Sequence, residues 1–304
     1  MNILHVGSVA NVPQTLCNEW RKLEYYSDVI SFEQKENHKI GIDFYYPMDY
    51  SIISRIKKLY ILAGIIPDYD LVHFHYSTGL PFGLDLPLWK DQQIVMHFHG
   101  DDIRGKKVPR MIKKYADFIY VSTPDLLEYA SNCKADVLYI PNPIDLDDYK
   151  IIGTGVGEEK DTINIVHAPS NRARKGTEWI CRAIDRLRGN GFKINFNLVE
   201  NMNHWDAVEY YKSADIIIDQ LLVGWYGMVA IEGMALGKPV CCYIRDDLLD
   251  KYDPQVVNIN KDNLYENLKS LIQDYDFRRE IGMSGRRYVE KYHDSRKVVK
   301  MLYR

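Results

Sequence analysis

The chain has 304 residues, enough for two domains of about 150 residues that each bury a core. Its 39 Lys and Arg residues stand against 42 Asp and Glu residues, a formal net charge of −3, which excludes a global basic field for nucleic acid. The five cysteines are odd in number, scattered and without metal-ligand spacing, so we expect no disulfide framework, no zinc site and a reducing, cytoplasmic location.

The N-terminal half is predicted to be a Rossmann-like domain. Residues 2–6 form an apolar strand that ends at Gly7 and Ser8, and residues 16–23 show helical spacing. Because parallel strands point their carboxyl ends at a ligand crevice, the loop from Gly7 to Asn11 is a candidate acceptor or phosphate contact, with simple chain reversal as the alternative. The chain starts with a strand and has no run of ~20 apolar residues, so we expect a soluble or peripheral protein.

A stretch from residue 51 to 67 places apolar residues at helical spacing beside basic ones, and a second basic stretch covers residues 104–114. Amphipathic helices with Lys and Arg beside exposed apolar residues bind anionic lipid. The alternative is an ordinary helix packed on the sheet with a solvated basic side. Peripheral contact with an anionic membrane is therefore a hypothesis.

Two further strands end in paired histidines. His73 and His75 lie two residues apart, as do His97 and His99, so the members of each pair face the same side of a strand. A transition metal is one interpretation, but no acidic ligands accompany the pairs, and we predict packed core residues and no metal site. His99 can donate a hydrogen bond near a reacting hydroxyl, which makes it a candidate catalytic residue.

The first half closes with helix, strand and helix patterns over residues 108–130 and a strand over 137–142. Asn142 ends this strand and is a candidate for lining the cleft, with a plain turn residue as the alternative. Residues 153–161 are glycine-rich and then charged, which marks a domain boundary.

In the second half, a strand over residues 163–167 leads into a loop with Ser170 and Asn171. Arg172, Arg174 and Lys175 stand at the junction with the next helix, where cationic groups can balance the charge on a departing diphosphate. A basic loop that is merely solvated is the alternative. A strand over 193–199 and a helix over 205–212 follow. Later elements are a strand at 240–244 and helices at 263–273 and 277–303, the last with Gly282 and Gly285 as bends.

The most informative stretch is a strand at 216–218, a glycine turn and an apolar helix that ends at Gly237. The free amides of Gly227, Met228 and Val229 at the helix start suit a diphosphate. Glu232 lies one turn into the helix, where a carboxylate needs partners, and ribose hydroxyls would serve. The alternative is a glutamate on a partly solvated face.

This stretch resembles the donor-site signature of GT-B glycosyltransferases of the family-4 type. In GWYGMVAIEGMALG, Glu232 matches the second Glu of the signature, which holds the ribose, and Gly224 replaces the first, which touches the transferred sugar. His99 resembles the His of the family's His-Gly-x-Asp loop. Lys175 resembles the Lys of its phosphate clamp, with Arg172 or Arg174 in place of the clamp's Arg. Asp219 is a candidate substitute for the missing Glu.

The resemblance implies two Rossmann-like domains facing a cleft, with an N-terminal acceptor-side domain over 1–152, a crossover helix at 287–304 and a donor-binding domain over 153–286. It implies a retaining hexosyltransferase that moves sugar from a nucleotide-diphosphate sugar to a saccharide or lipid-linked acceptor, in bacterial cell-surface polysaccharide or glycolipid synthesis. No cofactor or metal is expected, and the location is the cytoplasm or the inner face of the plasma membrane. The alternatives are a nucleotide-sugar 2-epimerase and a non-catalytic sugar-nucleotide-binding module.

Overall fold

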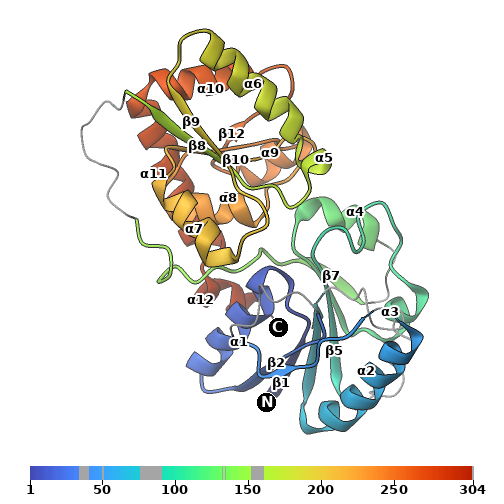
Figure 1. The fold of residues 1–304 in the computed structure, drawn as a ribbon. Helices are drawn as coiled ribbons and strands as arrows, with labels where there is room; N and C mark the ends of the chain where they lie inside the picture. Colours follow the sequence, from blue (N-terminus) through green and yellow to red (C-terminus); the bar gives the residue numbers. More distant parts are fainter. Residues whose placement is uncertain are drawn as a thin grey trace. The chain divides into compact units, whose positions relative to one another are not determined.

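The computed structural model describes residues 1–33, 41–49, 51–75, 91–131, 133, 135–151 and 161–302. The described chain divides into two compact units, Met1–Pro143 with Ser295–Arg304, and Ile144–Asp294 (Figure 1). The predicted glycine-rich boundary up to residue 160 and the predicted end of the last helix at residue 303 lie outside the described residues.

The first unit is built on a parallel sheet of seven strands in the order β3-β2-β1-β4-β5-β6-β7. Its strands are β1 (Asn2–Val6), β2 (Tyr26–Ser31), β3 (Phe44–Tyr45), β4 (Leu71–His75), β5 (Gln93–Phe98), β6 (Phe118–Val121) and β7 (Asp136–Tyr139). Its α-helices are α1 (Val12–Lys22), α2 (Ile52–Ile65), α3 (Arg110–Tyr115), α4 (Leu127–Ala130) and α12 (Ser295–Val298). Helices α1 and α12 cover one face, and α2, α3 and α4 cover the other (Figure 1).

The two-residue period of the strands decides which side chains each layer receives. Leu4 and Val6 of β1 enter the core under α2, whereas Ile3 faces α1. His5 follows the same alternation and lies on the α1 side, fully buried. Strand β1 is therefore apolar on the α2 side and carries the buried His5 together with Ile3 on the α1 side.

The second unit has a parallel sheet of five strands in the order β12-β11-β10-β8-β9. Its strands are β8 (Ile163–His167), β9 (Ile194–Leu198), β10 (Ile216–Gln220), β11 (Val240–Cys242) and β12 (Val257–Asn258). Its helices are α5 (Arg172–Lys175), α6 (Thr177–Gly189), α7 (His204–Ser213), α8 (Met228–Ala235), α9 (Asp246–Tyr252), α10 (Leu264–Gln273) and α11 (Tyr275–Tyr292). Helices α6 and α10 pack on one face, and α7, α8 and α11 on the other. The predicted α/β class with two parallel sheets is confirmed.

Each sheet reverses its strand order once. Strand β1 pairs with both β2 and β4, and β8 pairs with both β9 and β10. In open parallel sheets the crevice at such a reversal, beyond the carboxyl ends of the strands, is where ligands bind. The residues that follow β1, β4, β8 and β10 are therefore candidates for ligand binding in each unit.

The boundary between the units differs from the predicted one. Residues 144–152 and 287–294, placed in the first domain by the sequence, belong to the second unit. Ile144 pairs with Asp294 in a parallel bridge, and its amide donates to the His293 carbonyl at 2.8 Å. The Arg286 guanidinium donates to the Tyr149 carbonyl at 2.6 Å. These contacts hold both connecting segments on the second unit, and composition alone gives no sign of them.

The two glycines of α11 permit close packing; the sequence interpretation of them as bends is wrong. Helix α11 runs without a break from Tyr275 to Tyr292. A Cβ on Gly282 would lie 2.2 Å from the Gly237 carbonyl oxygen, and one on Gly285 would lie 2.9 Å from the Met234 side chain. α11 therefore approaches α8 at backbone distance, which fixes the helix that carries Glu232. None of the helices in the described ranges combines the length and the apolar character needed to cross a bilayer.

We expect Gly282→Ala to destabilise the second unit by about 1–3 kcal/mol because the added methyl overlaps the Gly237 carbonyl. Thermal unfolding followed by circular dichroism measures the loss. Gly189→Ala at the end of α6 is the matched control, since a Cβ there meets nothing within 4 Å. A Gly282→Ala protein as stable as Gly189→Ala would contradict this packing.

Candidate functional site

At the strand-order reversal of the second unit, a buried carboxylate accepts hydrogen bonds from one cationic side chain and one backbone amide. Asp219, near the end of β10, is 0 % exposed, and its Oδ1 accepts from Lys175 Nζ at 2.6 Å. Its Oδ2 accepts from the Gly227 amide at 2.6 Å. A Cβ built on Gly227 would lie 3.3 Å from Lys175 Nζ. The lysine therefore stands at the start of α8, as a phosphate clamp requires.

Gln220 organises the turn that leads to this helix. Its side-chain amide donates to the carbonyls of Trp225 and Tyr243 at 3.1 and 2.7 Å. Its side-chain oxygen accepts from the amides of Leu222 and Val223 at 2.7 and 2.6 Å. A fully buried amide with both ends satisfied makes the turn rigid. The turn therefore holds the Gly227 amide in register with Asp219.

Gly224, which stands where the family signature has its first Glu, occupies a position closed to other residues. Its φ is +89°, and a Cβ there would lie 2.9 Å from Arg245 Cγ. Both the left-handed backbone and the packed Arg245 side chain disfavour any larger residue. Gly224, which replaces the glutamate, thus belongs to a turn that is closed by a 3.0 Å hydrogen bond from the Arg245 amide to the Gly224 carbonyl.

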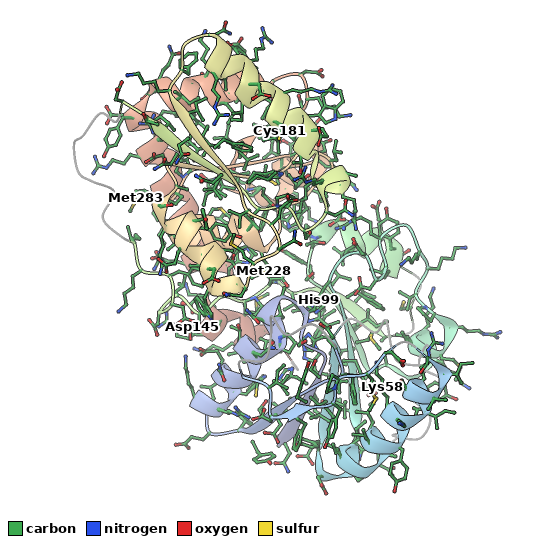
Figure 2. All side chains as sticks on the ribbon, in the orientation of Figure 1. Lys58, His99, Asp145, Cys181, Met228 and Met283 are labelled. Carbon is green, nitrogen blue, oxygen red and sulfur yellow. The ribbon has the colours of Figure 1, made fainter. Side chains whose placement is uncertain are left out.

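Helix α8 offers fewer free amides than the sequence predicts. Gly227 was predicted to present its amide to a diphosphate, but that amide is engaged by Asp219. Met228 and Val229, the first two helical residues, have no intrahelical acceptor by the geometry of an α-helix, and no side chain caps this end. Met228 is labelled in Figure 2. The anion-binding amides of this terminus are therefore those of Met228 and Val229.

Glu232 lies one turn further along α8 and is 4 % exposed. The Tyr149 hydroxyl donates to its Oε1 at 3.4 Å, and His204 Nε2 lies 3.7 Å from the same oxygen. Burial raises the pKa of Glu232 to about 8, and the charge of Asp219 acts in the same direction, against the hydrogen bond from Tyr149. At neutral pH the carboxyl is therefore mostly protonated, and its contact with His204 is not an ion pair.

The junction between β8 and α6 is fixed by a buried histidine. His167 Nδ1 donates to the Ile218 carbonyl at 2.8 Å, so Nε2 is left to accept from the Thr177 hydroxyl at 2.9 Å. Burial lowers the pKa of His167 to about 4, which keeps the ring neutral. β8, β10 and α6 are tied together at the point where the basic loop emerges.

The candidate residues of the basic loop lie in different environments. Arg172 makes a two-pronged contact with Glu200, with Nε–Oε1 and Nη2–Oε2 distances of 2.9 and 2.5 Å. The hydrogen bonds to Glu200 raise the pKa of Arg172. The Asn171 side chain accepts from the Arg174 amide at 3.0 Å and caps α5, and Ser170 lies exposed beside it. The structure brings Lys175 to the helix start and pairs Arg172 with an acid that the sequence analysis did not weigh.

In the first unit the loop after β1 lies beside the end of β4. Gly7 has a φ of +115°, and a Cβ there would lie 2.4 Å from the His75 carbonyl oxygen. Ser8 is buried and its Oγ accepts from the Ser31 hydroxyl at 3.1 Å, whereas Asn11 has a left-handed backbone at the start of α1. Close packing therefore requires glycine at position 7, and Ser8 is a buried residue of the core.

Five histidines gather on the α1 face of this sheet. To the four recognised in the sequence the structure adds His5, because β1 lies next to β4, with His5 in register with His73. Three pairs of ring nitrogens lie at hydrogen-bonding distance: His5 and His75 at 3.0 Å, His75 and His99 at 3.1 Å, and His73 and His97 at 3.2 Å. Burial lowers the pKa of His5 and of His99 to about 3, and lowers those of the other three well below the usual value.

His99, labelled in Figure 2, is the member of this cluster that is partly exposed. Its backbone amide and those of Gly100 and Ile103 donate to the Asp102 carboxylate at 2.8 to 3.0 Å, which shapes the loop. The buried Asn142 side chain interacts with His99 and raises its pKa, against the larger effect of burial. The structure thus brings two of the predicted acceptor-side residues together, and because His99 is neutral it can donate a hydrogen bond but does not act as a cationic acid.

Within the described residues, two overlapping sets of three histidines have ligand atoms within 4.8 Å of one another: His5, His73 and His75, and His75, His97 and His99. The rings of His73 and His75 are stacked 4.0 Å apart, as are those of His97 and His99 at 4.2 Å. Neither set includes a carboxylate that would balance a divalent charge.

Sequence reasoning missed Tyr149, His204 and Glu200, which surround the candidate donor residues. Tyr149 comes from the segment assigned to the other domain, and His204 and Glu200 follow β9, which no motif marks. The one available signal was Glu232 itself, since a buried acid needs polar neighbours, but its partners are remote in sequence.

A model of the family described as Glycosyltransferase Family 4 matches residues 9–148. An uncharacterised glycosyltransferase of Methanocaldococcus jannaschii is 26 % identical over 262 residues, which is 73 % of this chain and 71 % of that protein. The chain also superposes on sucrose-phosphate synthase from Thermosynechococcus elongatus with a TM-score of 0.70 at 15 % identity, covering 99 % of this chain and 97 % of the other.

A second solved structure, UDP-GlcNAc 2-epimerase from Neisseria meningitidis bound to UDP-GlcNAc, gives a TM-score of 0.62 at 15 % identity, covering 99 % and 98 % of the two chains. At these identities the superpositions establish the fold. They agree with two Rossmann-like domains of the GT-B type.

We expect stability to fall steeply in mild acid because of the histidine cluster. The folded pKa values lie below the unfolded value of about 6.5, so the unfolded chain binds more protons in acid. The stabilisation is complete above about pH 6.5 and is lost as the pH falls toward 3, at about 2 kcal/mol per histidine by pH 5. Urea unfolding between pH 5 and 8 measures this slope. His73→Leu should reduce it by about one proton, and a slope near zero in the parent protein would contradict the burial of neutral rings.

Proposed function

We propose that this chain is a family-4-like GT-B glycosyltransferase that moves a sugar from a nucleotide-diphosphate sugar to a hydroxyl group of an acceptor. The observation that carries the proposal is the position of Lys175 at the start of α8, held there by Asp219. The second unit binds the donor, and the loops of Gly7 and His99 in the first unit bind the acceptor.

The diphosphate of the donor is bound by Lys175 and by the amides of Met228 and Val229. An ammonium group has three donors, and Asp219 takes one, so two are left for phosphate oxygens. The positive end of the α8 dipole acts on the same group. Together these stabilise the negative charge that grows on the departing diphosphate, and in this proposal they take the place of a divalent metal, so that no cofactor is required.

Glu232 binds the ribose of the donor. Its buried carboxyl has the Tyr149 hydroxyl as its polar neighbour at 3.4 Å, which leaves lone pairs for sugar hydroxyls. Because it is mostly protonated at neutral pH, it can also donate to a ribose oxygen. Arg174, Asn171 and Ser170 extend the donor surface from the basic loop, and Arg172 contributes its charge together with Glu200.

The transferred sugar meets no carboxylate at Gly224, and Asp219 is fully buried and engaged. We assign the sugar-side contact to His99 and Asn142 of the first unit. We further propose that the transfer retains the anomeric configuration. The proposed role is in bacterial cell-surface polysaccharide or glycolipid synthesis. Proton NMR of the product's anomeric signal tests the first of these.

A nucleotide-sugar 2-epimerase is the alternative that a specific observation favours, since an epimerase bound to UDP-GlcNAc has the same fold. Incubation with nucleotide sugar alone separates the two: an epimerase forms the 2-epimer without acceptor, whereas a transferase leaves the donor unchanged apart from slow hydrolysis. A non-catalytic module would bind nucleotide tightly and show neither reaction.

We expect Glu232→Ala to raise the donor KM by roughly 10- to 100-fold, the loss of one or two hydrogen bonds to the donor. Glu232→Gln, which reproduces the protonated carboxyl, should raise it much less at pH 7. Lys175→Ala should lower kcat by roughly 100-fold because its charge acts mainly in the transition state. Lys193→Ala, which removes a surface lysine paired with Asp161, is the control. Parent-like kinetics in Lys175→Ala would sink the proposed site.

Helix α2 supports a lipid-linked acceptor. Four large apolar side chains point away from the sheet: Ile52, Ile53, Ile56 and Tyr60 are 75, 66, 61 and 83 % exposed. The buried side of the helix contains Leu62 and Lys58, whose ammonium lies over the Phe32 ring. A helix packed on the sheet with only a basic outer side does not describe this arrangement, because the outer stripe is apolar.

The surroundings of this stripe are basic. Lys57 is exposed beside it. Helix α3, which packs on the same face of the sheet, begins with the exposed Arg110, and Lys106 and Lys107 are exposed in the segment that precedes it. An exposed apolar stripe flanked by cations matches the boundary between acyl chains and anionic headgroups. The partner that we propose for this face is therefore an anionic membrane, and the location that we propose is the inner face of the plasma membrane.

We expect the protein to sediment with vesicles containing phosphatidylglycerol and not with phosphatidylcholine vesicles. Replacing both Ile52 and Ile56 with Ser should weaken the partition at least roughly tenfold, since burying an isoleucine contributes about 1.5–3 kcal/mol. Met283→Ser, at an exposed apolar position of the second unit, is the control. Parent protein that stays in the supernatant with anionic vesicles would rule out membrane docking.

A further inference from the structure

Three of the five histidines form one continuous hydrogen-bonded chain. His5 Nδ1 contacts His75 Nε2 at 3.0 Å, and His75 Nδ1 contacts His99 Nε2 at 3.1 Å. The chain crosses from β1 through β4 to the loop after β5, and it runs from the fully buried His5 to the partly exposed His99. His73 and His97 form a separate hydrogen-bonded pair, whose rings stack on those of His75 and His99.

The proton positions in such a chain are coupled. A neutral imidazole carries one proton on one of its two nitrogens, and each ring-to-ring contact needs one donor and one acceptor. Only two arrangements satisfy both contacts: all three rings protonated on Nδ1, or all three on Nε2. The tautomer of His99 is thus tied to that of His75, and through it to that of His5.

The buried end of the chain favours protonation on Nδ1. The alternative would place a proton on His5 Nε2, a buried atom with no acceptor among the described residues, and orphaned buried N–H groups are rare. At the other end, the Asn142 side chain interacts with His99 and raises its pKa, against the larger effect of burial. His99 Nε2 is occupied by His75, so Nδ1 is the nitrogen left to donate.

We propose that His75 and His5 are positioning residues that hold His99 in its Nδ1–H tautomer, so that the ring presents one fixed hydrogen-bond donor to the transferred sugar or to Asn142. The catalytic part of this statement rests on the proposed function, which assigns the sugar-side contact to His99. The tautomer itself does not depend on that assignment.

A metal ion is the competing explanation of nitrogens 3.0 to 3.2 Å apart, because tetrahedral ligands at about 2.0 Å from zinc are spaced similarly. The stacked rings and the lack of a carboxylate in both histidine sets speak for hydrogen bonds. The two accounts differ in what the ring nitrogens show spectroscopically.

The test is ¹⁵N NMR of the full-length protein labelled at histidine, with His99 assigned by comparison with His99→Gln. In the parent protein we expect His99 to show a protonated Nδ1 and an unprotonated Nε2. His75→Leu should shift His99 toward Nε2–H. His75→Asn, whose amide can restore a donor near the Nδ1 position, should return it to Nδ1–H. His73→Leu removes a contact of the separate pair and should leave His99 unchanged.

If His75→Leu does not fold, His5→Leu, which releases the far end of the chain, takes its place. An Nε2–H tautomer in the parent protein, or a tautomer unmoved in His75→Leu and His5→Leu, would overturn the inference. So would stoichiometric metal in the purified protein with metal-shifted nitrogens.

With an active transferase, His75→Leu should lower kcat by roughly 10- to 100-fold at unchanged donor KM, and His75→Asn should recover part of it. Absence of all transfer activity would remove the proposed function and leave the tautomer result standing.

Discussion

The structure of the candidate donor site depends on one buried carboxylate. Asp219 is excluded from water, and a charge in that position is tolerated only with close partners. Its closest partners are the Lys175 ammonium and the Gly227 amide, each at 2.6 Å, and these contacts fix the lysine against the start of α8. Gln220 then sets the turn between β10 and α8, and the close approach of α11 at Gly282 sets the position of the helix itself. The geometry proposed for diphosphate binding is therefore preorganised, and a ligand does not have to assemble it.

The two units differ in the charge of the polar side chains at corresponding positions of their sheets. Both strand-order reversals carry buried polar residues at the carboxyl ends of their strands. In the second unit they include the charged Asp219, which holds Lys175 at a helix terminus that suits an anion. In the first unit they are histidines kept neutral by burial. Charge suits a diphosphate, and uncharged donors suit sugar hydroxyls. The division of the proposed substrate between the units follows from this difference.

The sequence predicted the local elements well and the long-range contacts poorly. Strand β8, the helix after Gly176 and the helix carrying Glu232 all follow from hydrophobic periodicity and glycine position. The basic loop was expected near the helix start, and Lys175 is there. The use of the Gly227 amide by Asp219 was not foreseen, because a residue eight positions earlier has no periodic relation to it. Tyr149 beside Glu232 was missed for the same reason, and so was His5, since strand order cannot be read from composition.

The most direct test of the central claim compares two ligands in two proteins. Isothermal titration calorimetry gives the affinity of the parent protein and of Lys175→Ala for a nucleoside diphosphate and for the matching nucleoside. If the lysine held by Asp219 binds the diphosphate, the substitution weakens the diphosphate at least roughly tenfold and leaves the nucleoside unchanged. An equal effect on both ligands, or no effect on the diphosphate, would contradict the account.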